Sequence, residues 1–435
     1  MRLSVNKSNI PDIISWLLIA YYSLIAQWIW SGRGTIENLI YISVILSVVC
    51  VLSFKVTPDR LVLYLFAFLL VTALVWSTLN ASTHEYLVQD LKSMAGSFLV
   101  YAYLFRFRRL KNDTYKEFME ITRIVLTCYM VINSVIIFLQ SRIPYFLMNK
   151  SAIASVHNNS YFDQLTGFIG INGTTRWTML TVLVILMNFH KAFTNSKSAS
   201  SKKLIIFTVI FSAVSLVIAG INNARAFFIL LPLTLLLYYI YSPTLNLKLK
   251  IRIVFGTVAG LAVIYIVYLT NGSVNRFINN LITDKYEVYS TFNVDKLLES
   301  NDDRAIAVNY AVKYGGLFGR GIGSIPMHSS NNQVKYLGLN SASSFIYMIG
   351  SAGYLLYSVF LALIAIGKNK AGKTRYIVYP AYLVIVSYFL PVYSSITLMF
   401  TLACILSILC NSKQEETISD ENRNSNHLWR IKLRK

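Results

Sequence analysis

Charged residues are scarce in this chain. They form 14% of its 435 residues, while hydrophobic residues form 55%; a typical soluble domain contains about 25% charged residues. This scarcity excludes an ordinary soluble protein and indicates a chain that folds in lipid. Apolar runs of about twenty residues recur along nearly the whole sequence, and about twenty residues are needed for a helix to cross a hydrocarbon core of roughly 30 Å.

Cysteine is also scarce. The chain has four, at positions 50, 128, 404 and 410, each in or at the edge of an apolar run and none with CxxC or metal-ligand spacing. We therefore expect no disulfide and no structural zinc. The signatures HExxH and GxSxG are missing too, which removes two familiar hydrolase motifs. No cofactor or metal ion is expected.

Twelve apolar segments predict an all-α polytopic membrane protein. The first follows Arg2 and Lys7 and lacks a small-x-small cleavage site, so it is read as a retained signal anchor with the N-terminus in the cytoplasm. The predicted spans are 13–30, 39–54, 61–79, 86–105, 121–140, 174–193, 204–220, 225–241, 251–270, 341–367, 376–392 and 395–410.

The distribution of Lys and Arg tests this topology. Connecting segments expected in the cytoplasm hold 26 of these residues and those expected outside hold 12, as the positive-inside rule requires. Both termini are therefore predicted to be cytoplasmic. The net charge of +21 is then mainly a topology signal, and no nucleic-acid partner is expected.

Residues 1–412 read as one transmembrane domain, and residues 413–435 as a polar cytoplasmic tail that is expected to be disordered. Two segments expected outside are too long to be mere connectors. Residues 141–173 mix aromatic residues, Asn and Gly, which suggests a structured cap or lid. Residues 271–340 form a large extracytoplasmic loop between the ninth and tenth spans.

The large loop contains a short predicted helix. Asn301 to Asp303 can cap its start, apolar residues recur at three and four spacing between Arg304 and Tyr314, and Gly315–Gly316 can end it. The glycine-rich turn GGLFGRGIGS comes at the end of this helix.

Four arginines expected outside are candidates for phosphate binding, because the guanidinium fork suits phosphate. They are Arg176, Arg225, Arg304 and Arg320. In the alternative reading, Arg176 and Arg225 only reach lipid headgroups.

The glycine-rich turn is a second candidate. The backbone N–H groups around Gly319 and Gly321 could bind an anion beside Arg320. The alternative is a flexible turn that leads into the tenth span.

Acid and base candidates are few. Asp163, Asp303 and His328 lie in the outer segments, and Asp90 and Lys92 lie in the outer part of the fourth span, where an interfacial ion pair is an equal possibility. The abundant Tyr and Phe suit aromatic belts at the membrane interface.

One stretch resembles a known family. NNARAFFILL, then DDRAIAVNYAVKYGGLFGRGIGS in a large outer loop, then the span SSFIYMIGSAGYLLYSVFLALI are similar to the O-antigen polymerase and ligase superfamily over residues 221–365. In that family an Arg is followed, after ten intervening residues, by Gly, as Arg304 and Gly315 are here, and a GxGxG turn comes next. Elsewhere the chain agrees only in hydropathy.

The resemblance implies a metal-independent glycosyltransferase of the bacterial inner membrane that uses an undecaprenyl-pyrophosphate-linked oligosaccharide. A polymerase joins repeat units into O-antigen, capsule or exopolysaccharide, and a ligase moves the glycan onto lipid A core. Ligases carry a His just before the span that follows the large loop; LGLNSASSF has none, which favours a polymerase unless His328 substitutes.

The expected partners are the lipid-linked oligosaccharide, membrane lipids and, from the same pathway, a chain-length regulator and a flippase. The expected site has Arg225, Arg304, Asp303 and His328 as catalytic residues. Arg176, Arg320, Gly319, Gly321 and Asp163 are expected to bind pyrophosphate or glycan. The main alternative is a flippase or transporter for lipid-linked oligosaccharide.

Overall fold

The computed structural model describes residues 10–26, 38–45, 61–79, 86–148, 165–170, 173–194, 199–241, 303–324, 337–367 and 374–410, and the single residues 29, 81 and 153. This part of the chain is built from helices and contains no strand. Its elements are α1 (Ile10–Tyr21), η2 (Tyr22–Ala26), α4 (Leu61–Leu79), α5 (Leu87–Leu110), α6 (Asn112–Arg142), η4 (Gly167–Ile169), α8 (Thr174–Thr194), α9 (Ala199–Ile221), α10 (Phe227–Tyr241), α14 (Asp303–Gly315), α15 (Ser341–Ile366), α16 (Arg375–Phe389), η5 (Val392–Ser394) and α17 (Ile396–Cys410).

Every predicted span that falls in the described residues coincides at least in part with a helix, and the ninth, 251–270, lies outside them. Four of these helices, α6, α8, α9 and α15, are long and apolar enough to cross a membrane, and several shorter apolar helices pack beside them. The chain is therefore described as a helical membrane protein. The count of twelve crossings and the side that each end faces remain predictions.

One expected connector is helical instead. Residues 106–120 were predicted as a cytoplasmic loop, but α5 continues to Leu110 and α6 begins at Asn112, so that Lys111 alone separates them. Lys111 forms an ion pair with Asp12 in α1, and Arg109 donates to the carbonyl of Ile364 near the end of α15. The basic residues therefore bind the helix ends together.

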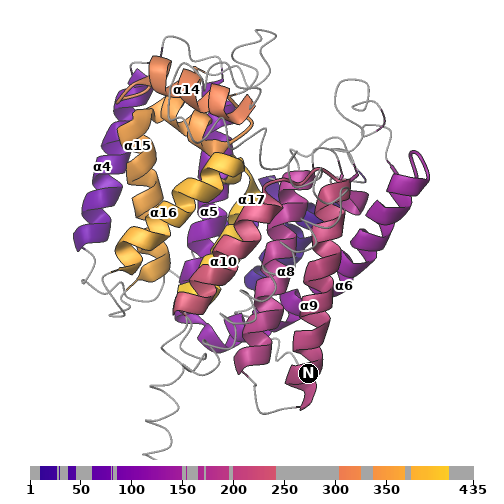
Figure 1. Ribbon diagram of the computed structural model, residues 1–435. Helices are drawn as coiled ribbons and strands as arrows, with labels where there is room; N and C mark the ends of the chain where they lie inside the picture. Colours follow the sequence, from indigo (N-terminus) through magenta and orange to yellow (C-terminus); the bar gives the residue numbers. More distant parts are fainter. Residues whose placement is uncertain are drawn as a thin grey trace, which may run out of the picture.

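The helix ends gather in two groups at opposite ends of the bundle. The end that carries α14, named here the α14 end, is uppermost in Figure 1. There Ser341 N donates to Leu390 O at 3.2 Å, and Ser93 Oγ donates to Ser394 O at 2.8 Å. The opposite end holds the Lys111–Asp12 pair. In each case the linked segments are ones that the charge distribution assigned to the same side.

Several tyrosines lie in the core of the described helices. Tyr101, Tyr379 and Tyr393 are fully buried. Their hydroxyls have partners: Tyr101 donates to Leu361 O at 2.7 Å, Tyr379 donates to Leu409 O at 3.1 Å and Tyr393 bonds with a serine on α15. A buried hydroxyl needs such a partner, so these bonds fix how α5, α15, α16 and α17 pack.

The two ends can be placed relative to the membrane by labelling. An exposed lysine lies at each end, Lys313 on α14 and Lys203 near the start of α9. In a cysteine-free background on spheroplasts, we expect Lys313→Cys to react with an impermeant maleimide and Lys203→Cys to react only after permeabilisation. The reverse pattern would contradict the predicted orientation.

Candidate functional site

The glycine-rich turn is joined to a break in α15. Gly350 has φ 75° and ψ 169° inside this helix, so the backbone groups on either side of it lose their helical partners. Residues 316–321 supply new ones through four backbone hydrogen bonds. These run from Arg320 N to Tyr347 O at 2.8 Å, from Gly321 N to Met348 O at 2.9 Å, from Ser351 N to Gly316 O at 3.0 Å and from Ala352 N to Leu317 O at 3.3 Å.

Close backbone packing explains the glycines of the turn. A Cβ at Gly319, where φ is 83°, would lie 2.3 Å from Met348 O, and one at Gly321, where φ is 103°, would lie 2.4 Å from Ser77 O of α4. Gly319 N donates to Gly315 O at 2.9 Å and Gly321 N donates to Met348 O. These amides are therefore occupied within the protein, and the anion nest expected at Gly319 and Gly321 is not formed in this conformation.

Asp90 ties the turn to the start of α5. Its buried carboxylate accepts a hydrogen bond through Oδ2 from Gly323 N at 3.1 Å, and Tyr86 N donates to Gly323 O at 3.4 Å. Oδ1 of Asp90 is buried without a hydrogen-bond partner among the described residues. The Asp90 carboxylate therefore links the turn to α5.

Arg320 lies over a group of tyrosines. It is exposed, and its Nε donates to Tyr314 O at 2.6 Å. The rings of Tyr310 and Tyr314 are 4.4 Å apart, and those of Tyr310 and Tyr347 are 6.1 Å apart. Desolvation, reinforced by Tyr347 and Tyr314, raises the pKa of Tyr310 above its ordinary value.

The segments that carry Arg176 and Arg225 pack together through neighbouring aromatic residues. Trp177 in the first turn of α8 packs on Phe227 at the start of α10, with ring centroids 5.3 Å apart. Arg176 is buried, with 6% of its surface exposed, whereas Arg225 is exposed in the turn between α9 and α10.

Local contacts position both arginines. Arg225 Nε donates to Asn223 Oδ1 at 2.8 Å, and Asn223 adopts a left-handed φ of 54° that makes the turn. The chain just before α8 is held by Asn133 of α6, which donates to Thr166 O at 3.2 Å and accepts from Phe168 N at 2.8 Å. Asn133 therefore holds Thr166 and Phe168 against α6.

Arg304 lies in the first turn of α14 and is half-buried. Arg304 and Arg320 lie on α14 and its turn, and Arg176 and Arg225 lie on α8 and the α9–α10 turn, all at the α14 end. The contacts described above do not link the first two arginines to the other two. The side chain of Asp303, and all of Asp163 and His328, lie outside the described residues. Among the described residues no group of three or more His, Cys, Asp or Glu side chains could hold a metal ion.

The segment where ligases of the resembled superfamily carry a histidine is a helix cap here. Asn340 is the N-cap of α15, and its Oδ1 accepts from Ser343 N at 2.8 Å. Ser343 and Ser344 donate their hydroxyls to Leu337 O at 2.8 and 2.9 Å. Because Asn340 and both serines are buried, this segment presents no acid or base at the surface.

Sequence reasoning missed three features. The kink at Gly350 and the polar role of Asn133 were hidden inside apolar runs. The third is one match to GxxxxGK[ST], Gly367 to Thr374. A phosphate-binding loop of that type follows a strand, but here the helix α15 precedes it, so the match lacks its structural context.

No family model, curated protein or solved structure matches the chain.

The close contact between the kink and the turn predicts how a substitution at Gly350 affects stability. At Gly350 a Cβ would lie 2.1 Å from Leu317 O. Gly350→Ala should therefore lower the free energy of unfolding in detergent by roughly 2–5 kcal/mol, from backbone strain and overpacking together. Gly338→Ala is the control, because a Cβ there meets nothing within 4 Å. Equal stability of the two variants would show that the turn does not depend on the kink.

Proposed function

We propose that the chain polymerises undecaprenyl-pyrophosphate-linked oligosaccharide repeat units into a surface polysaccharide, at the outer face of a bacterial inner membrane. The α14 end is then the extracytoplasmic end. The observation that carries the proposal is the placement of Arg176, Arg225, Arg304 and Arg320 at that one end, each in the first turn of a helix or in a turn beside a helix.

The proposed reaction is a glycosyl transfer. An acceptor hydroxyl on one lipid-linked unit attacks the anomeric carbon of the donor glycan. The bond from that carbon to the pyrophosphate oxygen breaks, undecaprenyl pyrophosphate leaves with the bonding electrons, and the hydroxyl proton passes to a base. The pyrophosphate gains negative charge as it leaves, so cations held in place beside it lower the barrier.

The arginines supply that positive charge without a metal. Arg225 and Arg304 are proposed as the catalytic cations, and Arg176 and Arg320 as binding residues for pyrophosphate or glycan. Arg225 is exposed and oriented by Asn223, so its remaining guanidinium nitrogens can reach a ligand from water. The base is proposed among Asp303, Asp163 and His328. Gly319, Gly321 and Asp90 then position Arg320 through the turn.

The tyrosines beside Arg320 suit a glycan. Tyr310 and Tyr314 present aromatic faces together with hydroxyl donors next to a cation, and such rings pack on the apolar faces of sugars while their hydroxyls bond to polar groups. This combination supports binding of an oligosaccharide and its phosphate at the α14 end.

Two alternatives are less well supported. A ligase would need its histidine, and the corresponding segment is a buried helix cap. A transporter for lipid-linked oligosaccharide is expected to carry charges in the middle of its helices. The charged residues that the described helices bury lie within the first or last turns, at Asp12, Asp90, Arg108, Arg176 and Arg375.

The proposal is tested by polymer length in cells. Arg225→Ala and Arg304→Ala should abolish long chains and leave single repeat units at the surface, because the leaving pyrophosphate loses a stabilising cation; a loss of about 10²–10³-fold in rate is typical for removing one such group. Lys203→Ala, at the opposite end, should leave chain length unchanged.

Membrane insertion of each variant is measured alongside. Arg225→Lys should retain more activity than Arg225→Ala if charge matters. Normal long chains in both alanine variants would overturn the polymerase assignment, and a build-up of units that never reach the surface would favour a transporter.

A further inference from the structure

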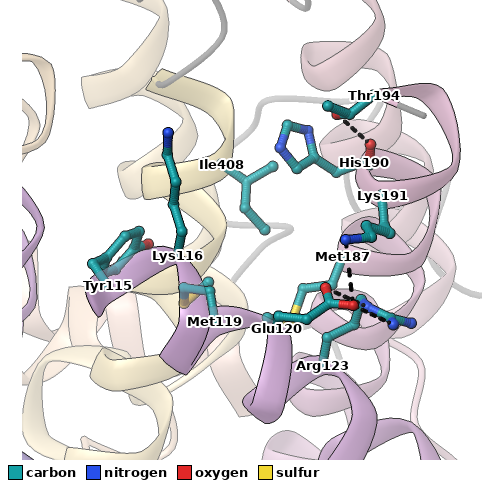
Figure 2. Close-up of a pocket in the computed structure, with 10 residues that line it drawn as sticks. All are labelled: Tyr115, Lys116, Met119, Glu120, Arg123, Met187, His190, Lys191, Thr194 and Ile408. Carbon is teal, nitrogen blue, oxygen red and sulfur yellow. Dashed lines mark hydrogen bonds and ion pairs between the residues drawn. The ribbon is translucent and has the colours of Figure 1, made fainter. Parts of the chain in front are cut away.

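A cavity of about 200 Å³ lies at the opposite end of the bundle, between α6, α8 and α17. Figure 2 shows Lys116 on one side of it, His190 and Lys191 on the other, and Glu120 with Arg123 below. None of these residues belongs to the site at the α14 end.

Helix length places this cavity at a membrane surface. α6 has 31 residues, which at 1.5 Å per residue gives roughly 46 Å, longer than the hydrocarbon core of roughly 30 Å. Its first nine residues precede the predicted span at 121–140 and extend into the headgroup region. Lys116, Glu120 and Arg123 follow one another at spacings of four and three, so they share one face of α6, from this extension to the start of the predicted span.

Cations outnumber carboxylates in the cavity. Arg123 binds Glu120 with both ends of its fork, Nε to Oε2 at 3.1 Å and Nη2 to Oε1 at 2.8 Å. Lys191 Nζ lies 3.4 Å from the same Oε1. The Glu120 carboxylate therefore pairs with both Arg123 and Lys191. Lys116 adds a third positive charge to the wall of the cavity.

The arginine and the carboxylate form a fixed base for the site. Arg123 Nη1 also donates to Asn188 Oδ1 at 2.8 Å, which attaches α6 to α8. The hydrogen bond from Arg123, the largest effect, holds the pKa of Glu120 below its ordinary value, so this carboxylate stays ionised and paired. A single carboxylate cannot neutralise both Arg123 and Lys191, so the lining of the cavity, to which Lys116 also contributes, keeps a net positive charge. Of the Lys191 side chain, 40% is exposed.

The rest of the wall is apolar. Met119, Met187 and Ile408 line it, and Ile124 and Val125, one turn further along α6, are exposed to the surroundings of the bundle. Basic pockets between membrane helices with an apolar exit bind the headgroups of anionic lipids. A phosphate group could bind the lysines here while an acyl chain follows the exposed apolar residues of α6.

We propose that this cavity is a binding site for a phosphate group, held by Lys116 and Lys191 above the Glu120–Arg123 pair. The apolar wall favours the headgroup of an anionic phospholipid in the adjacent leaflet over free phosphate. Such a site would anchor α6 against α8 and α17, and it is independent of the reaction proposed for the α14 end.

The test measures ligand binding to delipidated, full-length protein in detergent. Phosphatidylglycerol, phosphatidylcholine and inorganic phosphate are titrated separately, and bound lipid is followed by native mass spectrometry and by the melting temperature. Stabilisation by phosphatidylglycerol alone identifies a lipid headgroup site, and equal stabilisation by inorganic phosphate identifies a free-phosphate site. The proposal is overturned if neither phosphatidylglycerol nor inorganic phosphate binds better than phosphatidylcholine, whose headgroup carries no net charge.

Matched variants locate the binding. K116Q/K191Q should bind phosphatidylglycerol about thirtyfold more weakly, from the usual contribution of two lysines near an anionic lipid, and should melt like the parent protein without lipid. The control K202Q/K203Q removes two exposed lysines of α9 and should bind normally. An equal loss in the control would show general attraction to basic residues and would overturn the site.

Discussion

The broken helix α15 and the glycine-rich turn supply hydrogen-bond partners for each other's backbone groups. A helix that breaks inside an apolar bundle leaves carbonyl and N–H groups without partners, and each such group costs several kcal/mol where water is absent. The turn after α14 supplies the four missing partners. It can approach closely enough only because Gly319 in the turn and Gly350 opposite it lack side chains. The position of α14 depends on these hydrogen bonds between the turn and α15.

The arginines at the α14 end lie on two parts of the structure, and the first part includes this contact between the turn and α15. One part carries Arg304 and Arg320 on α14 and its turn, and Asp90 fastens it to α5. The other part carries Arg176 and Arg225, fixed by the Trp177–Phe227 contact and by Asn133. The proposed catalysis needs cations that are already in place before the pyrophosphate arrives, and both parts hold their arginines on anchored backbone.

Hydropathy predicted the helices well because lipid imposes one strong rule, that about twenty apolar residues make a span. Capping residues and glycines likewise predicted the short helix that is now α14. The kink at Gly350 could not be predicted, since its partners are more than twenty-five residues away in the sequence and its own neighbourhood reads as one apolar run. The glycines were interpreted as an anion nest because that pattern is local, but Gly319 N donates to Gly315 O and Gly321 N donates to Met348 O of α15.

The site shows the same division between local and tertiary information. The topology predicted from the distribution of Lys and Arg identified the arginines expected outside. The structure adds that Arg176 is buried beside an aromatic contact and that Arg225 is oriented by Asn223. Neither detail has a sequence signature. The charged cavity at the opposite end was visible only as a surplus of basic residues, because its ion pairs join α6 to α8 across a gap of more than sixty residues.

Reconstitution tests the central claim most directly. Purified protein in proteoliposomes receives only an undecaprenyl-pyrophosphate-linked oligosaccharide and EDTA, with no nucleotide sugar. A polymerase should yield longer glycans and release one undecaprenyl pyrophosphate for each glycosidic bond formed. Passage of the intact lipid-linked unit across the bilayer without any new glycosidic bond would contradict the proposed function.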